Sequence, residues 1–598
     1  MGKEMKKRDQ IDPKYKWKIE EMYPDEEQWK VDYKTVEDKA KDFAAYSGRL
    51  GESPQVLLEA LQKKDTIWLI LEKVYTYARM KKDEDNRVTR YQAMSDKAGS
   101  LIAKASSYLS FFTPELLEIP EEKLKGYLET PDGLGLYKHA INDLLREKAH
   151  VLSKAEENLM AQFSEIAGAT NDVFSMINNA DIKFGTIVDE DGDEVEVTHG
   201  RYIGFMESHD RRVRKDAFEH MYKAYEDLKN TLATTYNYNT KTDVITARIR
   251  KYGSAREAAL SGDNVPTEVY DNLIDTVNSR LDLLHRYVEV RRKLLKVDEV
   301  HMYDMYVPLV EMPKEEIPYE KALDLMREGL TPLGDHYIGK MNEGIDAGWI
   351  DVYENEGKTS GAYSFGSYDG MPYILLNYNG KLKDVFTIVH EMGHSMHSYY
   401  TRKNQPFVYG GHSIFTAEVA STVNEALLMH HLLNTSKDPE EKKYLLNLYI
   451  EEFRTTLFRQ TMFAEFEKLT HEAVENGEVL TAEWLSEEYG KLNRKYYGEK
   501  VAYDPQIDME WARIPHFYRA FYVYKYATGY SAAAAISSKI LKEGPVARDA
   551  YIEFLKTGEK DYPIELLKTA GVDMGKRDPI IQAMDAFEKL IVEIEKLV

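Results

Sequence analysis

Two histidines and a glutamate lie within five consecutive residues of the stretch VHEMGHSMHSYY, residues 389–400. If this stretch is helical, His390 and His394 lie one turn apart on one face, where both imidazoles can bind one ion. Glu391 lies beside them and could accept a proton from water at that ion, as the general base of a hydrolytic metal site does. The HExxH spacing therefore indicates a catalytic metal site, and a helix surface that happens to be rich in histidine is the alternative.

A catalytic zinc ion usually has three protein ligands and an open fourth position, so a third ligand is needed. The chain has no cysteine, which leaves His, Asp or Glu for that ligand. The pattern HExxHxxGxxH is excluded, because its last two fixed positions are occupied by His397 and Tyr400. A carboxylate from a later helix is the remaining option.

The stretch IFTAEVASTVNEALLMHHLL, residues 414–433, offers such a carboxylate. Glu418 follows His394 by 24 positions, and small neighbours such as Ala420 and Ser421 would let its helix approach another backbone closely. An acidic side chain on a face of small and apolar residues is costly to bury unless it is paired or binds a metal. Glu418 is therefore the predicted third ligand.

Three further polar residues near this pattern each have more than one interpretation. His397 could support the ligand histidines or face a substrate, or it could be a buried structural histidine. Glu425 lies seven residues beyond Glu418 on the same helix face, where it could orient a ligand histidine or be solvated. His412, in the turn YGGHS, could contact a substrate, although a loop histidine is often incidental.

The composition is that of an ordinary soluble globular protein. The chain has 598 residues, of which 43% are hydrophobic and 30% charged, so more than one domain is expected. A formal net charge of −23 argues against nucleic acid as a partner, because no basic surface for phosphates is implied. The charged N-terminus has no signal-peptide core, and no apolar run approaches the ~18 residues needed to span a bilayer. We expect a cytoplasmic protein without a membrane partner, either a monomer or a homodimer.

Most of the chain is predicted to be helical. Stretches such as residues 57–82, 151–177 and 269–297 place apolar residues at a spacing near 3.6, which is the period of a helix with one buried face. The predicted fold class is therefore mainly α.

Two stretches predict β-structure instead. Residues 182–198 alternate around an Asp-Gly turn, which is typical of a β-hairpin. Residues 349–380 hold three short β-like runs between Gly-rich turns and predict a small β-sheet next to the HExxH helix. Guided by the hairpin, we divide the chain near residue 200, into an N-terminal helical lobe (1–200) and a catalytic domain (201–598).

These residues resemble a known family. HEMGHSMH followed by FTAEVASTVNE is similar to the thimet-oligopeptidase-like zinc metallopeptidases, and most closely to their bacterial oligoendopeptidase F branch. The resemblance extends from about residue 140 to about residue 535. The other similar segments are LREKAHVLSKAEENLMA, DRRVRKDAFEHMYKAY, GAYSFGSY, PYILLNY and PHFYRAFYVYKYATGYSAA.

The resemblance implies a mostly helical, two-lobed ellipsoid with a deep substrate channel and one zinc ion at its floor. It also implies endopeptidase activity on short peptides that can enter the channel. By position, the zinc ligands would be His390, His394 and Glu418, with Glu391 as the general base. The groups that hydrogen-bond the substrate carbonyl and the tetrahedral intermediate would be His516, Tyr522 and Tyr526.

The run PYILLNY, residues 372–378, lies close before the HExxH helix. An edge strand beside an active site can bind an extended peptide through main-chain hydrogen bonds. The proximity and the resemblance together predict that Tyr373, Leu375 and Asn377 lie along the bound peptide.

Two other functions stay open. A zinc carboxypeptidase of similar helical architecture also uses HExxH with a later glutamate, but it needs a basic group near the metal, and none is obvious near Glu418 in the sequence. A non-catalytic helical protein with a structural zinc would lack a general base and an open ligand position, whereas Glu391 is present here.

Overall fold

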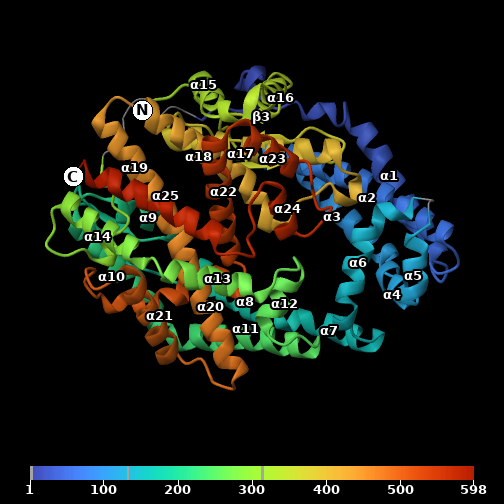
Figure 1. Cartoon of the computed structure of the whole chain (residues 1–598), viewed down its shortest axis with the longest axis horizontal. Helices are drawn as coiled ribbons and strands as arrows, with labels where there is room; N and C mark the ends of the chain where they lie inside the picture. Colours follow the sequence, from blue (N-terminus) through green and yellow to red (C-terminus); the bar gives the residue numbers. More distant parts are fainter. Residues whose placement is uncertain (1–4, 131–132, 311–315, 598) are drawn as a thin grey trace. The chain divides into compact units, whose positions relative to one another are not determined.

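The computed structural model describes residues 5–130, 133–310 and 316–597. Helices account for most of these residues, and the strands are few and short (Figure 1), which confirms the mainly α prediction. No helix in this part of the chain is long and apolar enough to cross a membrane.

Contacts between residues divide the chain into two compact units, each built from three separate stretches. The first unit consists of Met1–Ala149, Glu315–His431 and Ile536–Gly571, and the second of His150–Lys314, Leu432–Ala535 and Val572–Val598. Helices α18 (Ile414–Thr435) and α22 (Tyr524–Glu543) each continue from one unit into the other. Neither unit begins or ends at residue 200, and the division there into an N-terminal lobe and a catalytic domain stays a prediction.

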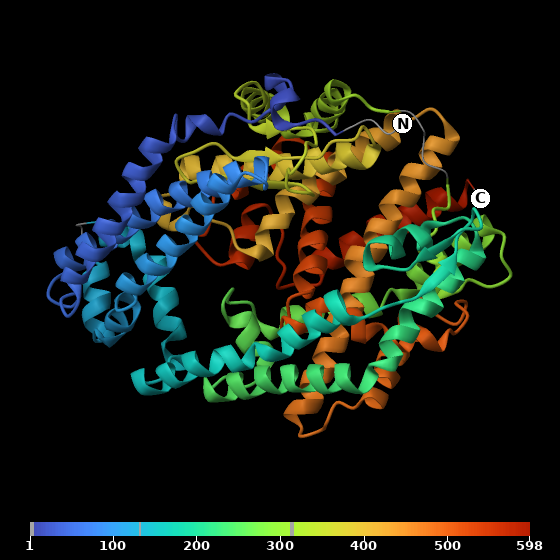
Figure 2. The same cartoon turned by 180° about the vertical axis from the view of Figure 1, so that it is seen from behind.

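The first unit begins with three long helices that pack against one another. This unit also contains part of α18 and part of α22. All its remaining α-helices and strands, the three long helices included, are α1 (Glu26–Phe43), α2 (Pro54–Glu84), α3 (Thr89–Leu109), α4 (Phe112–Glu118), α5 (Glu121–Leu128), α6 (Lys138–Glu147), α15 (Tyr319–Gly329), α16 (Gly334–Asp346), α17 (Leu382–Asn404), α23 (Pro545–Leu555), α24 (Pro563–Thr569), β3 (Ile350–Asp351), β4 (Tyr363–Phe365) and β5 (Tyr373–Leu375). Helices α1, α2 and α3 lie side by side (Figure 2), and their core includes the fully buried Val36, Leu57 and Leu101. Residues Tyr373 and Leu375 of β5 belong to the same core, which anchors the small sheet to these helices.

The predicted small sheet is present directly before α17, and its strand order is β3-β5-β4. The central strand β5 is parallel to β3 and antiparallel to β4. Helix α17 packs against both β4 and β5. The sheet therefore fixes the position of the helix that carries the HExxH residues.

The second unit is almost entirely helical. Its elements, apart from part of α18 and of α22, are α7 (Lys154–Ala167), α8 (Ala169–Met176), β1 (Thr186–Val188), β2 (Glu194–Glu196), α9 (His199–Glu207), α10 (Arg211–Asp227), α11 (Lys229–Ile249), α12 (Ala255–Ser261), α13 (Thr267–Asn278), α14 (Leu281–Leu295), α19 (Pro439–Phe453), α20 (Arg459–Glu475), α21 (Ala482–Tyr497) and α25 (Asp578–Glu595). The predicted hairpin forms from β1 and β2, which pair antiparallel. The predicted helical stretch 151–177 is two helices, because the low helix propensity of Gly168 allows a break between α7 and α8.

Candidate functional site

Helix α17 carries the HExxH residues and begins at a capped turn. The Asp384 carboxylate accepts hydrogen bonds from the backbone N–H groups of Asn379, at 2.9 Å, and of Lys381, at 3.0 Å. These bonds satisfy donors at the start of the helix, where no intrahelical partner exists. The apolar face of α17 is fully buried, with Ile388 and Met392 at 0% exposure. The helix is thus fixed at its start and along its length.

Helices α17 and α18 approach each other closely at Gly393. A Cβ atom at this position would lie 2.6 Å from Ser421 Cα and 2.7 Å from the Ala420 carbonyl oxygen, closer than real Cβ contacts. The side-chain amide of Asn424 donates to the Val389 carbonyl at 3.3 Å and joins the same two helices. The prediction that small residues of α18 allow a close helix approach is confirmed.

This approach brings together the side chains of His390, His394 and Glu418, here called the His-His-Glu group. Among the described residues it is the one group of three whose possible ligand atoms lie within 4.8 Å of one another. The two Nε2 atoms are 3.2 Å apart, and Glu418 Oε2 lies 3.4 Å from Nε2 of His390 and 3.5 Å from Nε2 of His394. The three predicted ligands therefore converge on one point.

The spacing of these atoms fits a tetrahedral metal ion. Ligand atoms about 2.0–2.1 Å from one ion in a tetrahedron are about 3.3–3.4 Å apart. The three observed separations of 3.2, 3.4 and 3.5 Å match that edge length. Two imidazoles and one carboxylate also leave a fourth position of the tetrahedron for water or substrate.

Both carboxylates of α18 on this face contact the ligand histidines. The His390 and His394 side chains hold the pKa of Glu418 well below its ordinary value, so this carboxylate stays ionised. Glu425 Oε2 lies 3.3 Å from Nδ1 of His390. That contact directs the opposite ring nitrogen, Nε2, toward Glu418, which is the orienting role considered for Glu425.

Glu391 is buried beside the group, with 8% of its surface exposed. Burial raises the pKa of its carboxyl above the ordinary value, while the neighbouring His390 and His394 and the backbone N–H of Ser364 oppose that shift. A raised pKa makes the ionised carboxylate a stronger proton acceptor. The position and the electrostatics both suit a general base.

The Ser364 N–H can reach Glu391 because it points out of the sheet edge. Ile374 of β5, which lies opposite Ser364, directs its own N–H to the Trp349 carbonyl at 2.8 Å, on the other side of β5. In an antiparallel pair, two residues directly opposite each other direct their N–H groups either both toward each other or both away. The Ser364 N–H therefore also faces away from β5. The sequence analysis missed this residue, although it lies in the quoted segment GAYSFGSY.

The prediction that β5 is an edge strand is wrong. Strand β5 is central, with β3 on one side and β4 on the other, so its main chain cannot pair with a peptide. Tyr373 and Leu375 are fully buried, and the Asn377 side chain donates to the carbonyls of Thr359 and Gly361. The sheet has two outer strands, β3 and β4, and of these β4 carries Ser364 beside Glu391.

His397 and His412 stack on each other next to the metal-binding face of α17. Their ring centroids are 4.0 Å apart, and His397 is only 2% exposed. Of the interpretations considered for His397, contact with substrate is therefore wrong, because the ring is buried. His412 contacts Ser398 through Nε2, at 3.3 Å, and lines a cavity.

That cavity has a volume of about 600 Å³ and borders the outer strand β4. Its wall includes Ser364 and Phe365 of β4, together with Trp68, Phe407 and Arg402. The wall also contains the apolar or aromatic side chains of Leu71, Tyr75, Ile102 and Tyr368, so the cavity can accept an apolar group. It lies next to the Ser364 N–H that contacts Glu391.

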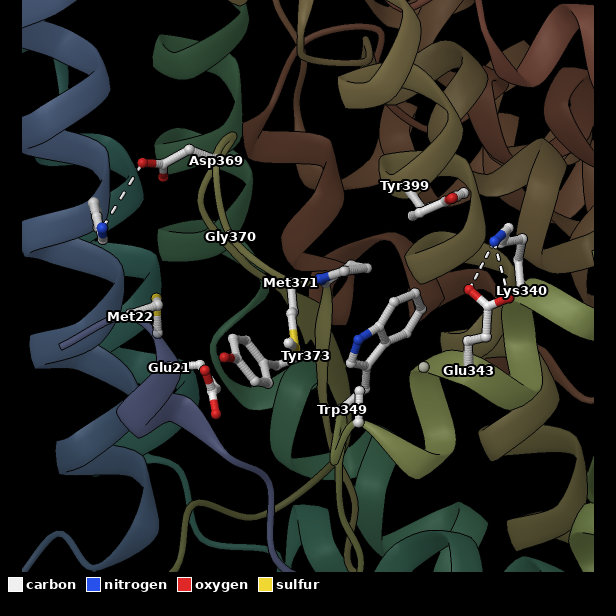
Figure 3. Close-up of a pocket in the computed structure, with 14 residues that line it drawn as sticks. Glu21, Met22, Lys340, Glu343, Trp349, Asp369, Gly370, Met371, Tyr373 and Tyr399 are labelled. Carbon is white, nitrogen blue, oxygen red and sulfur yellow. Dashed lines mark hydrogen bonds and ion pairs between the residues drawn. The ribbon is translucent and has the colours of Figure 1, made fainter. Parts of the chain in front are cut away.

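A second cavity, of about 440 Å³, lies between Trp349, Tyr373 and Tyr399 (Figure 3). Its two cations are already paired, Lys73 with Asp369, at 3.8 Å, and Lys340 with Glu343, at 2.7 Å. Neither cavity is lined by the His-His-Glu group or by Glu391, but Ser364, whose backbone N–H contacts Glu391, lines the cavity beside β4 and not this one. The cavity beside β4 is therefore the better place for a substrate side chain.

The three residues predicted to bind the substrate carbonyl gather in the second unit. The ring centroids of His516 and Tyr522 are 6.1 Å apart, those of His516 and Tyr526 are 5.9 Å apart, and those of the two tyrosines are 5.5 Å apart. All three side chains are half-buried. We call these three side chains the ring cluster; their role in catalysis stays a prediction.

Comparisons with known proteins identify the family of this chain. Residues 204–586 match the family model of peptidase family M3, and residues 115–184 match that of oligopeptidase F. The chain is 50% identical over 581 residues to oligopeptidase PepF of Bacillus subtilis (strain 168), covering 97% of this chain and 87% of that protein. A crystal structure from Chlamydophila abortus matches with a TM-score of 0.95 and 36% identity over all of both chains. The structure of oligoendopeptidase-F from Enterococcus faecium matches with a TM-score of 0.74 and 39% identity, covering 96% of this chain and 99% of that one.

Replacing Gly393 by alanine should separate α17 from α18. Overpacking of this kind costs about 1–3 kcal/mol, which corresponds to about a ten- to hundredfold weaker metal affinity if the strain falls on the ligand geometry. Competition titration with a chelating indicator measures that affinity. Gly339→Ala on α16 is the control, because a Cβ there meets nothing within 4 Å. Equal affinities for the two variants would contradict the close-approach argument.

Glu418→Ala should lose the metal, because two imidazoles alone hold a divalent ion weakly. Glu425→Ala is the matched comparison, since it removes a carboxylate from the same helix face that contacts a ligand histidine without being a ligand itself. Loss of such a contact weakens metal affinity by about 10–100-fold. Metal content after dialysis is the measurement. Stoichiometric metal in the Glu418→Ala protein would place the third ligand elsewhere.

Proposed function

The chain belongs to peptidase family M3 and is a metallo-oligopeptidase, and from this premise we propose that it hydrolyses internal bonds of short peptides with one Zn²⁺ ion. The proposal names zinc because two imidazoles and a carboxylate, with no cysteine in the chain, form a usual donor set of catalytic zinc. The observation that carries it is the 3.2–3.5 Å spacing of the His-His-Glu group beside a buried glutamate. We expect this activity in the cytoplasm.

His390, His394 and Glu418 would hold the ion. When bound, zinc supplies a Lewis acid that polarises the scissile carbonyl and lowers the pKa of water. Glu391 accepts the proton of the attacking water and later delivers it to the leaving amine. Burial of this carboxyl, which raises its pKa, favours acceptance of the proton, and the Ser364 N–H lies against it.

The substrate would pair with β4, an outer strand of the small sheet. Of the two outer strands, β4 takes the role that the sequence analysis gave to β5, because it carries Ser364 next to Glu391 and borders the cavity. A peptide along β4 passes the general base and places a side chain at the aromatic-walled cavity of about 600 Å³. Main-chain pairing of this kind tolerates many sequences, and the cavity favours a large apolar side chain beside the cleaved bond.

The ring cluster would stabilise the oxyanion of the tetrahedral intermediate. Tyrosine hydroxyls and a neutral histidine can donate hydrogen bonds to developing negative charge. Burial and the nearby Arg519 lower the pKa of His516, so its imidazole is neutral at pH 7. Electrostatic stabilisation by such donors is worth several kcal/mol in comparable sites.

A carboxypeptidase is the nearest alternative, because the cavity wall does contain a cation, Arg402. Its guanidinium, however, donates to the carbonyls of Ser367, at 2.8 Å, and Gly366, at 3.0 Å. The nearby carboxyl of Glu72 also balances its charge. A substrate carboxylate would have to compete with these groups, so recognition of a free C-terminus is the less favoured function.

Glu391→Gln should abolish turnover while the metal stays bound. The amide keeps the size of the side chain but cannot accept the proton, so kcat should fall by about 10²-fold or more. Zinc content and kcat are measured on the same sample. Near-normal kcat at full zinc content would contradict the role of Glu391.

Peptides blocked by N-acetylation and C-amidation should be cleaved at internal bonds, because an endopeptidase needs neither free terminus. Mass spectrometry of the products identifies the bond. A matched peptide with a free C-terminus is the control. Cleavage of the free peptide alone, with loss of single C-terminal residues, would establish the carboxypeptidase alternative instead.

A further inference from the structure

The second unit contains a strained turn directly before Tyr522. The chain leaves the short helix Pro515–Tyr518 and enters α22 through Phe521, whose backbone has φ = +52°. A bulky non-glycine residue rarely adopts positive φ, and such a conformation costs about 1–3 kcal/mol. It persists only where the surroundings fix it. The residue held this way is the immediate neighbour of one member of the ring cluster.

The surroundings that fix Phe521 are supplied by α20 and α13. Glu467 Oε1 accepts a hydrogen bond from the Phe521 backbone N–H at 3.0 Å. The Phe521 ring packs on His471, with centroids 4.5 Å apart, and edge-on against Tyr270, with centroids 5.5 Å apart. Phe521 is only 2% exposed. The main chain of the turn is thus held through one buried carboxyl and its side chain through two rings.

The burial of Glu467 is energetically unfavourable. Its surface is 0% exposed, and its Oε2 atom has no hydrogen-bond partner among the described residues. Burial raises the pKa of this carboxyl well above its ordinary value, and Asp243 nearby adds to the shift. An unpaired buried carboxyl lowers stability, so packing alone gives no reason for glutamate here.

We propose that Glu467 is a positioning residue for catalysis: its hydrogen bond to Phe521 N–H fixes the strained turn and so sets the place of Tyr522 in the ring cluster. The proposal rests on the proposed role of the cluster in stabilising the intermediate. A displaced donor weakens binding of the intermediate more than binding of the substrate. Loss of the hydrogen bond should therefore lower kcat and leave KM nearly unchanged.

Three variants of α20 test this. Glu467→Leu removes the acceptor and should lower kcat about ten- to hundredfold, with KM within about twofold and full zinc content. Glu467→Gln keeps an oxygen for the Phe521 N–H and should restore kcat to within about threefold of wild type. Thr470→Val is the matched control, because it removes buried hydrogen bonds, with Tyr236 and with the Glu467 carbonyl, but leaves the Glu467 carboxyl to accept from the Phe521 N–H. It should leave kcat unchanged.

The outcomes separate this proposal from the proposed function. Wild-type kcat in Glu467→Leu, or an equal loss in Thr470→Val at equal Tm, would overturn the role of Glu467. If Glu467→Leu does not fold, Glu467→Asp replaces it, since its shorter side chain cannot reach the turn, and the same loss of kcat is expected.

In a double-mutant cycle, Tyr522→Phe should largely remove the effect of Glu467→Leu, and full additivity would overturn action through Tyr522. Unchanged kcat in Tyr522→Phe alone would refute the donor assignment itself.

Discussion

The candidate metal site depends on the close approach of two helix backbones at Gly393. Because this residue has no Cβ, Ser421 and Ala420 of α18 can approach so closely that a Cβ atom here would lie 2.6 Å from Ser421 Cα and 2.7 Å from the Ala420 oxygen. The approach brings Glu418 to the two histidines of α17, with ligand atoms 3.4 and 3.5 Å apart. Any larger side chain at this crossing would move the carboxylate away from the point that all three ligands share.

The small sheet fixes the position of α17, which the helix crossing at Gly393 alone does not do. Helix α17 needs a fixed start and a buried face, and the sheet packed against it is itself anchored in the core of α1, α2 and α3 through β5. The outer strand β4 directs the Ser364 N–H to the general-base candidate Glu391. One strand therefore contacts the general-base candidate and borders the cavity, so the proposed proton transfer and the proposed peptide placement would share one backbone segment.

Much of this site could be predicted from the sequence, because the information is local. The spacing of His390 and His394 and the small residues around Glu418 depend only on helix geometry, and the structure brings these side chains together. The order of strands was not predictable, since a short apolar run such as residues 373–375 looks the same at the edge and in the centre of a sheet. The roles of Ser364 and Glu467 depend on contacts across the fold, with Glu391 and Phe521 respectively, which no sequence spacing reveals.

X-ray absorption at the zinc edge of the purified wild-type protein, loaded with one equivalent of zinc, tests the central claim most directly. The helix crossing predicts two imidazole nitrogens at ~2.0–2.1 Å, with oxygen from a carboxylate and from water or substrate completing the shell. A spectrum with three or more imidazole ligands, or with fewer than two, would contradict a site built from His390, His394 and Glu418.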